Sequence, residues 1–125
     1  NKFSYSLPQH EDTRGTFVEI FKTENSGQIS FFTAHPGITR GGHYHHTKTE
    51  KFLVVKGLAK FKFRDIITDE TIEIVTSSSN YEIVDMIPGY AHNITNIGDE
   101  ELIVILWASE NFDKNRPDTI SNEVF

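Results

Sequence analysis

The sequence predicts an all-β domain, either a sandwich or a small barrel. Roughly nine short runs rich in β-branched and aromatic residues recur at intervals of about ten residues. Gly, Pro, Asn and Asp separate these runs, and no segment carries the apolar repeat of a long amphipathic helix. Ten phenylalanines provide apolar side chains for a core. This pattern is typical of two packed layers of β-sheet.

The first third of the chain is predicted to form strands joined by polar turns. Residues 11–15 (EDTRG) have the composition of a turn, and the β-branched and aromatic residues of 16–22 (TFVEIFK) predict a strand. A second turn at 24–27 (ENSG) precedes a strand at 28–34 (QISFFTA). The next segment, 34–42 (AHPGITRGG), is predicted as a loop or short strand that leads into a histidine-rich segment.

The remainder of the chain shows the patterns expected of further strands. In 58–65 (LAKFKFRD) the apolar residues share one face and the basic residues the other, so one side of this strand should face water. Residues 102–108 (LIVILWA) are apolar throughout, which predicts a strand covered on both faces, with Trp107 in the core. The tail, 110–125, is predicted to be irregular, with at most one helical turn. The other predicted strands are 51–55, 71–75, 81–87 and 92–97.

Length and composition limit the class of protein. A chain of 125 residues suits one domain, spanning 1–125, and its start at Asn1 rather than Met leads us to expect a domain excised from a longer protein. The net charge of −6 argues against binding nucleic acid through its phosphates. No apolar stretch approaches the roughly 18 residues of a membrane span, and the chain shows neither a signal-like start nor cysteine. We therefore expect a cytoplasmic protein.

The most informative segment, 37–57, contains two histidines one residue apart and a glutamate. In an extended chain His43 and His45 project from the same face, so both can enter one cavity. Glu50 falls on the opposite parity, and it joins them only if the chain turns or bulges within the polar residues 46–49. The segment therefore predicts two imidazoles and one carboxylate in one place.

A second segment far downstream, MIPGYAHNITN, completes this donor set with His92. Asn96 lies four residues later on the same predicted strand face, where we expect it to hydrogen-bond to a group around the metal ligands rather than touch the metal itself. Three imidazoles and one carboxylate are a ligand set for a first-row transition metal. The predicted metal ligands are His43, His45, Glu50 and His92.

The spacing of these residues resembles the two sequence motifs of the cupin family. The first motif is matched at every fixed position by Gly37, His43, His45, Glu50 and Gly57. The second is matched by Pro88, Gly89, His92 and Asn96. In this second motif the Pro and Gly are adjacent, and Glu82 replaces the leading glycine, so the loop before the histidine departs from the family pattern. The resemblance implies a double-stranded β-helix, or jelly roll, with a metal in the barrel mouth.

Two further segments resemble the nucleotide-sugar 3,5-epimerases of the rhamnose pathway. Residues 12–19 (DTRGTFVE) resemble their D-x-R-G-x-F-x-E opening, and 40–44 (RGGHY) resemble their R-G-x-H-Y segment. Lys51 falls where that family keeps an active-site lysine, whereas the family's catalytic tyrosine has no counterpart because its region reads LIVILWA. The resemblance implies removal and return of a proton beside a ketone. The candidates for that proton transfer are Lys51, Tyr90 and His46.

Together these features resemble the C-terminal cupin domains of bifunctional staphylococcal capsular polysaccharide synthesis enzymes, which act on the route to UDP-N-acetyl-L-fucosamine. The resemblance covers nearly the whole chain and implies C3 epimerisation of a UDP-4-keto-6-deoxy-N-acetylhexosamine, with Zn²⁺ polarising the ketone. It also implies a homodimer and an N-terminal NADPH-dependent reductase domain, whose glycine-rich nucleotide fingerprint does not occur here. The candidates for binding the UDP diphosphate are Arg14, Arg40 and Arg64.

Two questions stay open at the level of sequence. In the metal-free epimerases the histidine of R-G-x-H is the general base, and a histidine cannot fill that role while it binds metal. We favour the ligand role for His43 because three other ligands accompany it. The same donors also suit an Fe(II) oxygenase, and a metal that only stabilises the fold would suit a non-catalytic sugar-binding cupin. We predict the epimerase and keep these two functions as alternatives.

Overall fold

All regular structure in the described part of the chain is β-strand, which confirms the predicted all-β class. The structure is a computed structural model that describes residues 3–24, 26–45, 49–109 and 119–121, with 42–45 and 119–121 described by backbone alone. No helix long and apolar enough to cross a membrane occurs among these residues. The strands are β1 (His10–Asp12), β2 (Gly15–Lys22), β3 (Gln28–Ala34), β4 (Thr39–His45), β5 (Glu50–Lys56), β6 (Leu58–Asp65), β7 (Thr71–Ser77), β8 (Ile83–Met86), β9 (Tyr90–Asn96), β10 (Leu102–Ala108) and β11 (Thr119–Ser121).

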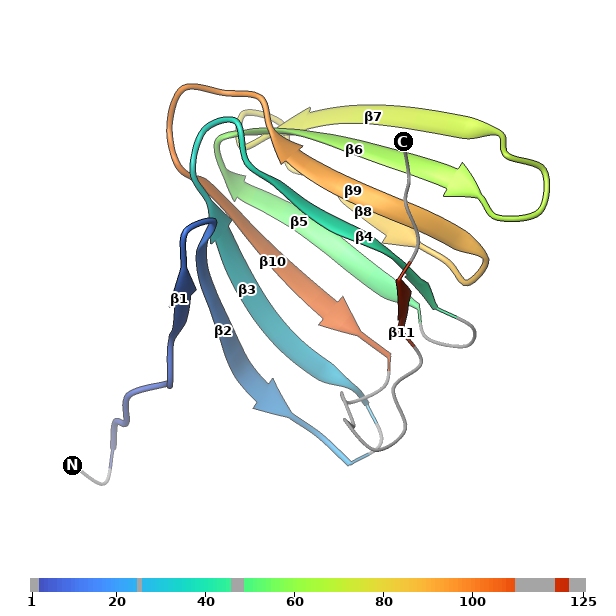
Figure 1. Cartoon of the computed structure of the whole chain (residues 1–125). Coiled ribbons are helices and arrows are strands. Elements are labelled where there is room, and N and C mark those ends of the chain that lie inside the picture. The colour runs from blue at the N-terminus through green and yellow to red at the C-terminus, as the bar shows by residue number, and fades with distance from the viewer. Residues whose placement is uncertain (1–2, 25, 46–48, 110–118, 122–125) are drawn as a thin grey trace.

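The strands form two antiparallel sheets (Figure 1). The six-stranded sheet has the order β1-β2-β3-β10-β5-β8, and the five-stranded sheet has the order β11-β4-β9-β6-β7. The chain crosses between the sheets repeatedly, from β3 to β4, from β4 to β5 and from β9 to β10. Such crossing connections are those of a double-sheet jelly roll. The predicted jelly-roll architecture is therefore confirmed.

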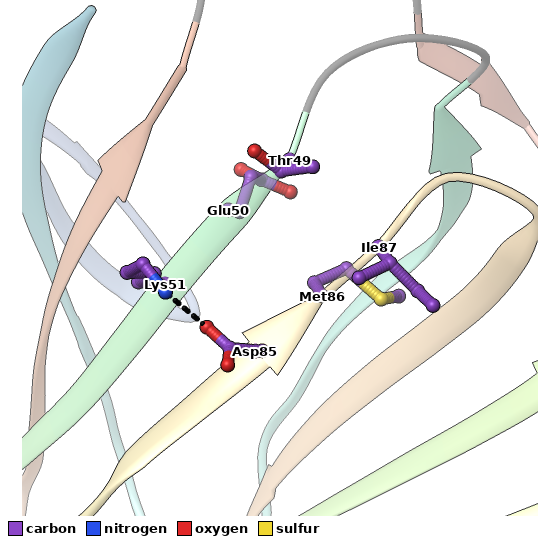
Figure 2. Close-up of a pocket in the computed structure, with 6 residues that line it drawn as sticks. All are labelled: Thr49, Glu50, Lys51, Asp85, Met86 and Ile87. Carbon is purple, nitrogen blue, oxygen red and sulfur yellow. Dashed lines mark hydrogen bonds and ion pairs between the residues drawn. The ribbon is translucent and has the colours of Figure 1, made fainter.

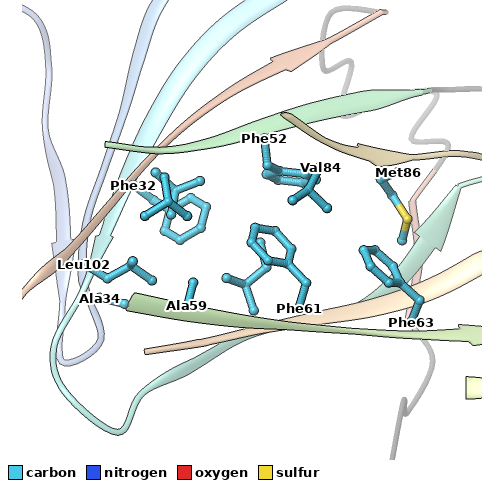
Figure 3. Packing of buried hydrophobic residues seen from close by; sticks show 12 residues of the cluster. Phe32, Ala34, Phe52, Ala59, Phe61, Phe63, Val84, Met86 and Leu102 are labelled. Carbon is cyan, nitrogen blue, oxygen red and sulfur yellow. The ribbon is translucent and has the colours of Figure 1, made fainter. Parts of the chain in front are cut away.

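The core lies between the two sheets and is built from alternate residues of each strand. In β6 the predicted alternation is confirmed, because Ala59, Phe61 and Phe63 are buried while the lysines between them are partly exposed. Phe52 and Val84 face them from the six-stranded sheet (Figure 3). The ring centroids of Phe52 and Phe61 are 5.7 Å apart, within the range of favourable aromatic pairs.

The outer side of β10 differs from the prediction. Trp107 was expected in the core, but it is only partly buried, and its indole Nε1 donates a hydrogen bond to the carbonyl oxygen of Ser26 at 2.8 Å. Ile103 and Ile105, which alternate with it, are also partly buried. An apolar strand sequence therefore did not mean equal burial on both faces.

Both ends of the described fold contain short strands where turns or irregular chain were predicted. Within the predicted turn 11–15, β1 pairs with the start of β2. In the tail, β11 pairs with β4 through Thr119 and Ser121, while 110–118 and 122–125 lie outside the described residues. Both strands lie at sheet edges, where a few paired residues suffice.

Asn96 does not orient a neighbour of the predicted metal ligands, so that expectation was wrong. It ends β9 and is almost completely buried, with 1% of its surface exposed. Its Nδ2 donates to the carbonyl oxygens of Ala34 at 2.9 Å and Glu100 at 2.8 Å, and its Oδ1 accepts from the amide of Gly98 at 2.9 Å. Asn96 therefore fixes the loop between β9 and β10.

Replacing Asn96 with alanine should lower the free energy of unfolding by about 3 kcal/mol, because buried peptide groups would lose their partners. Urea unfolding followed by Trp107 fluorescence measures the change. Asn93→Ala, on the other face of β9, is the control and should stay within about 0.5 kcal/mol of the wild type. Equal stability of the Asn96 variant and the wild type would contradict this assignment.

Candidate active site

Glu50 begins β5 on the inner face of the six-stranded sheet. Burial alternates along the strand, since Glu50 (7% exposed) and Phe52 are buried while Lys51 between them is exposed. Glu50 is paired in register with Met86 of β8 on one side and with Ala108 of β10 on the other. A carboxylate buried among such neighbours requires polar or cationic partners to remain charged.

His92 reaches the same interior from the opposite sheet. It is 2% exposed on β9, where its register partners are Phe63 of β6 and His43 of β4. Its ring centroid lies 5.6 Å from that of Phe52. Because Phe52 is two residues from Glu50 on the same face, the carboxylate and the imidazole enter one end of the interior from facing sheets.

The two remaining predicted ligands belong to β4. His43 is the register partner of His92, and His45 is paired with Thr119 of β11. The chain leaves β4 at His45 and begins β5 in the other sheet at Glu50, and residues 46–48 of the predicted turn lie outside the described residues. The side chains of 42–48 lie outside the described residues, and among the described side chains no three His, Asp or Glu gather as a metal site. The four-ligand site stays a prediction that the strand register favours.

A β-bulge sets the position of His43 relative to His92. The register of β4 on β9 shifts between Gly41 and His43. Gly41 has a φ of 125°, and a Cβ atom there would lie 2.4 Å from the carbonyl oxygen of His92. Glycine accommodates both this backbone conformation and this close approach. The bulge thus gives a physical reason for a glycine ahead of the predicted ligand.

A pocket of about 190 Å³ opens beside Glu50 (Figure 2). Strands β5 and β8 are paired from Leu53 to Glu50, and the pocket lies where this pairing ends. It is lined by Thr49, Glu50, Lys51, Asp85, Met86 and Ile87. The pocket therefore lies beside both the buried carboxylate of Glu50 and the exposed Lys51–Asp85 ion pair.

The candidates for proton transfer differ in where they lie. Lys51 projects from the outer face of β5, is 51% exposed, and its Nζ forms an ion pair with Asp85 Oδ1 at 2.7 Å (Figure 2). Tyr90 is partly buried against the core on the same face of β9 as His92. His46 lies outside the described residues. The structure brings Tyr90 to the barrel interior and leaves Lys51 outside it.

Arg40 and Arg14 form a cationic group beside β3. The Nε of Arg40 donates to the carbonyl oxygen of Thr33 at 3.1 Å, and its guanidinium lies 5.2 Å from the ring centroid of Phe32. Arg14 forms an ion pair with Asp12 at 2.6 Å, and these hydrogen bonds hold the pKa of the Asp12 carboxyl well below its usual range. Burial lowers the pKa of Arg40, and the positive charge of Arg14 lowers it further.

Arg14 and Arg40 stand at different distances from the predicted ligands. Arg14 precedes β2, whose far end at Lys22 lies in the same cross-strand row as Glu50. From the start of β2, next to Arg14, to Lys22 is seven residues of strand, or about 23 Å. Arg40 lies three residues before His43, or about 10 Å along β4. The backbone of Arg40 is therefore the nearer of the two to the predicted ligands, whereas its guanidinium lies beside Thr33, close to Arg14.

Arg64, the third predicted phosphate ligand, lies at the same end of the barrel as His92. It follows Phe63, the register partner of His92, but it alternates onto the outer side of β6. Its guanidinium forms an ion pair with Asp69 at 2.8 Å in the β6–β7 turn. The structure thus places Arg14 and Arg40 near each other and Arg64 apart from both.

The sequence predictions missed a polar row on the inner face of the six-stranded sheet. Glu19 of β2 is opposite Ser30 of β3, and the Nε2 of Gln28 donates to the Oγ of the buried Ser30 at 2.9 Å. Gln28 shares a cross-strand row with Glu50, separated from it only by Ala108. The signal was available, because period-2 alternation in QISFFTA puts Gln28 and Ser30 on one face.

Comparison with known families identifies the relatives of this fold and site. The family model described as the polysaccharide biosynthesis C-terminal domain matches residues 10–120. The chain belongs to this family. Within it, the chain is 59% identical over 124 residues to UDP-2-acetamido-2,6-beta-L-arabino-hexul-4-ose reductase from Pseudomonas aeruginosa, a match that covers 99% of this chain and 33% of that protein.

Solved structures agree with this family assignment. Capsular polysaccharide assembling protein CapF from Staphylococcus aureus superposes with a TM-score of 0.95 at 49% identity, covering 98% of this chain and 36% of that chain. Oxalate decarboxylase from Lactobacillus farciminis shares the fold at a TM-score of 0.73 and 24% identity, covering 92% and 33%. The resemblance to the staphylococcal capsule enzymes and the cupin fold are both confirmed. The chain spans about a third of the length of these relatives.

Proposed function

We propose that this chain catalyses C3 epimerisation of a UDP-4-keto-6-deoxy-N-acetylhexosamine for capsular polysaccharide synthesis. The observation that carries the proposal is the entry of buried Glu50 and His92 into one end of the barrel from facing sheets. The substrate class is supported by two relatives. The P. aeruginosa protein is named for a UDP-linked 2-acetamido-hexul-4-ose, and the S. aureus protein is a capsular polysaccharide assembling protein.

The proposed cofactor is a divalent metal, Zn²⁺, held by His43, His45, Glu50 and His92. Three imidazoles and one carboxylate fit Zn²⁺ by donor type, and a cation would compensate the burial of the carboxylate. When bound, the metal would act as a Lewis acid toward the C4 ketone. A structure of CapF contains the inhibitor 3-isopropenyl-tropolone, and the adjacent oxygens of a tropolone suit chelation of such a cation.

Proton transfer at C3 is assigned to Tyr90. Epimerisation removes the proton beside the ketone and returns it to the opposite face of the carbon, so an acid–base side chain must reach C3. Tyr90 shares the inner face of β9 with His92, two residues or about 7 Å away. Lys51 is directed outward in its ion pair with Asp85. A correctly placed acid–base group contributes roughly 10²–10⁴-fold to the rate.

The remaining contacts of the substrate follow from the positions of Arg40 and the aromatic core. With C4 of the sugar beside His43, the diphosphate on C1 extends toward Arg40, whose guanidinium suits phosphate oxygens. Phe52 and Phe63 flank His92 and exclude water from the reacting carbon. Arg14 and Arg64 remain predicted phosphate ligands, but this arrangement favours Arg40 over both for contact with the diphosphate.

In the longer relatives this domain would work beside a reductase. The chain covers only 33% of the P. aeruginosa reductase, so we assign the activity in that name to the remainder of the relative, with NADPH as hydride donor. Epimerisation at C3 would precede reduction of the C4 ketone, because the ketone is what makes the C3 proton removable. We also propose a homodimer in the cytoplasm.

The test is hydrogen exchange in D₂O. The chain incubated with a UDP-4-keto-6-deoxy-N-acetylhexosamine should incorporate deuterium at C3, which mass spectrometry and proton NMR detect without any reductase. Intact, unlabelled sugar that remains bound would favour the non-catalytic sugar-binding cupin. Consumption of O₂ by an iron-loaded chain would favour the oxygenase.

A further inference from the structure

We propose that the polar row formed by Glu19, Ser30 and Gln28 holds the 2-acetamido group of the substrate and selects it over a 2-hydroxyl group. The row lies on the inner face of β2 and β3, outside the predicted ligands, the pocket lining and the arginines. The proposal rests on the proposed function, because it takes the C4 ketone to lie beside Glu50 and His92.

The position of the row matches the span from C4 to the C2 substituent. Gln28, Ala108 and Glu50 are register partners on three neighbouring strands, so the backbones of the outer two are about 10 Å apart. Ala108 between them is buried and carries only a methyl group, so no long side chain of β10 separates the two. A pyranose beside Glu50 can therefore extend its C2 substituent over Ala108 toward Gln28.

The chemistry of the row matches an amide. An acetamido group has one N–H donor and one carbonyl acceptor, so its recognition requires an acceptor and a donor side by side. The amide of Gln28 provides both kinds of atom, and the carboxylate of Glu19 is an acceptor. The Gln28–Ser30 hydrogen bond of 2.9 Å fixes the direction of the Gln28 amide.

The charge of the row favours a neutral ligand over a phosphate. Glu19 forms an ion pair with Lys22 at 3.3 Å, so the two side chains add no net charge. The row therefore offers a phosphate no net positive charge. The guanidinium groups of Arg14 and Arg40 lie elsewhere, beside Asp12 and Thr33. An uncharged amide fits the row, whereas the diphosphate fits the arginines.

Binding of two stable probes tests the proposal without turnover. UDP-N-acetylglucosamine and UDP-glucose differ only at C2, and calorimetry with the whole chain should show at least tenfold tighter binding of the acetamido sugar. Gln28→Ala should reduce this ratio by about tenfold, with UDP-glucose affinity changed less than about threefold. Glu19→Gln, which keeps a hydrogen-bonding group at that position, should retain part of the preference. Lys56→Ala, at the exposed end of β5, is the control and should keep the full ratio.

The outcomes separate this proposal from the proposed reaction. Equal affinity of the wild type for both probes, or an equal loss for both in Gln28→Ala, would overturn the acetamido site. A preference of the wild type for UDP-N-acetylglucosamine that disappears in Gln28→Ala would support the acetamido site. This holds even if the D₂O exchange failed and the epimerase assignment had to be abandoned. Unchanged thermal unfolding of Gln28→Ala shows that a lost preference does not come from lost folding.

Discussion

Replacing His92 with alanine is expected to abolish binding of the proposed metal and to reduce C3 exchange by about 10³-fold or more. The imidazole is buried between the sheets, so no solvent-exposed group can take its place on the ion. Lewis-acid stabilisation of a developing enolate is worth several kcal/mol, and about 4 kcal/mol corresponds to 10³ in rate. Elemental analysis of the purified protein and deuterium incorporation at C3 measure the two effects.

A second variant separates metal loss from the cavity that His92→Ala creates. Glu50→Gln keeps nearly the same side-chain volume but removes the anionic ligand, so it should also lose metal and C3 exchange. The metal-free variant should unfold at nearly the same temperature as the metal-free wild type, because no cavity is created. Asn93→Ala, beside His92 on the outer face of β9, should keep both metal and exchange. Stoichiometric metal in both the His92 and Glu50 variants would refute the ligand assignment.

Replacing Tyr90 with phenylalanine is expected to leave the metal in place and to slow C3 exchange by roughly 10²–10⁴-fold. The substitution removes only the hydroxyl group, while the ring retains its packing against the core. Metal content measured beside D₂O exchange therefore distinguishes a proton-transfer role from a structural one.

The matched variant is Lys51→Ala, which removes an exposed ion pair on the outer face of β5. It should keep both metal and exchange, because exposed ion pairs contribute little to stability and Lys51 is directed away from the interior. The opposite result, with exchange lost in Lys51→Ala and kept in Tyr90→Phe, would transfer the role to the lysine.

The sequence predicted the fold class because its signals are local and periodic. Alternation in LAKFKFRD predicts which residues of β6 face the core, and the spacing from Gly37 to Gly57 indicates a cupin. Glu50 is buried on the inner face of β5, as a metal ligand would need to be, while its approach to the histidines stays a prediction. Local pattern and local geometry agree in these cases.

Other sequence predictions depend on which sheet, face or end a residue occupies. Lys51 follows Glu50 in the motif, but adjacent strand residues point to opposite faces and Glu50 takes the inner one, so a catalytic role for Lys51 stays a prediction. Asn96 does share a face with His92, but four residues along a strand correspond to about 13 Å, which takes it to a loop at the other end. Arg14 is distant for the same reason.

Strand β11, near the end of the chain, pairs with β4, which carries the predicted ligands His43 and His45. Backbone groups of Thr119–Ser121 pair with the otherwise open edge of β4. In a protein shortened before Thr119, β4 would be an unpaired edge strand, and a strand of another chain could pair with it in place of β11. Truncation or proteolysis near the C-terminus is therefore expected to disturb β4, the strand that carries two of the predicted metal ligands more than seventy positions upstream.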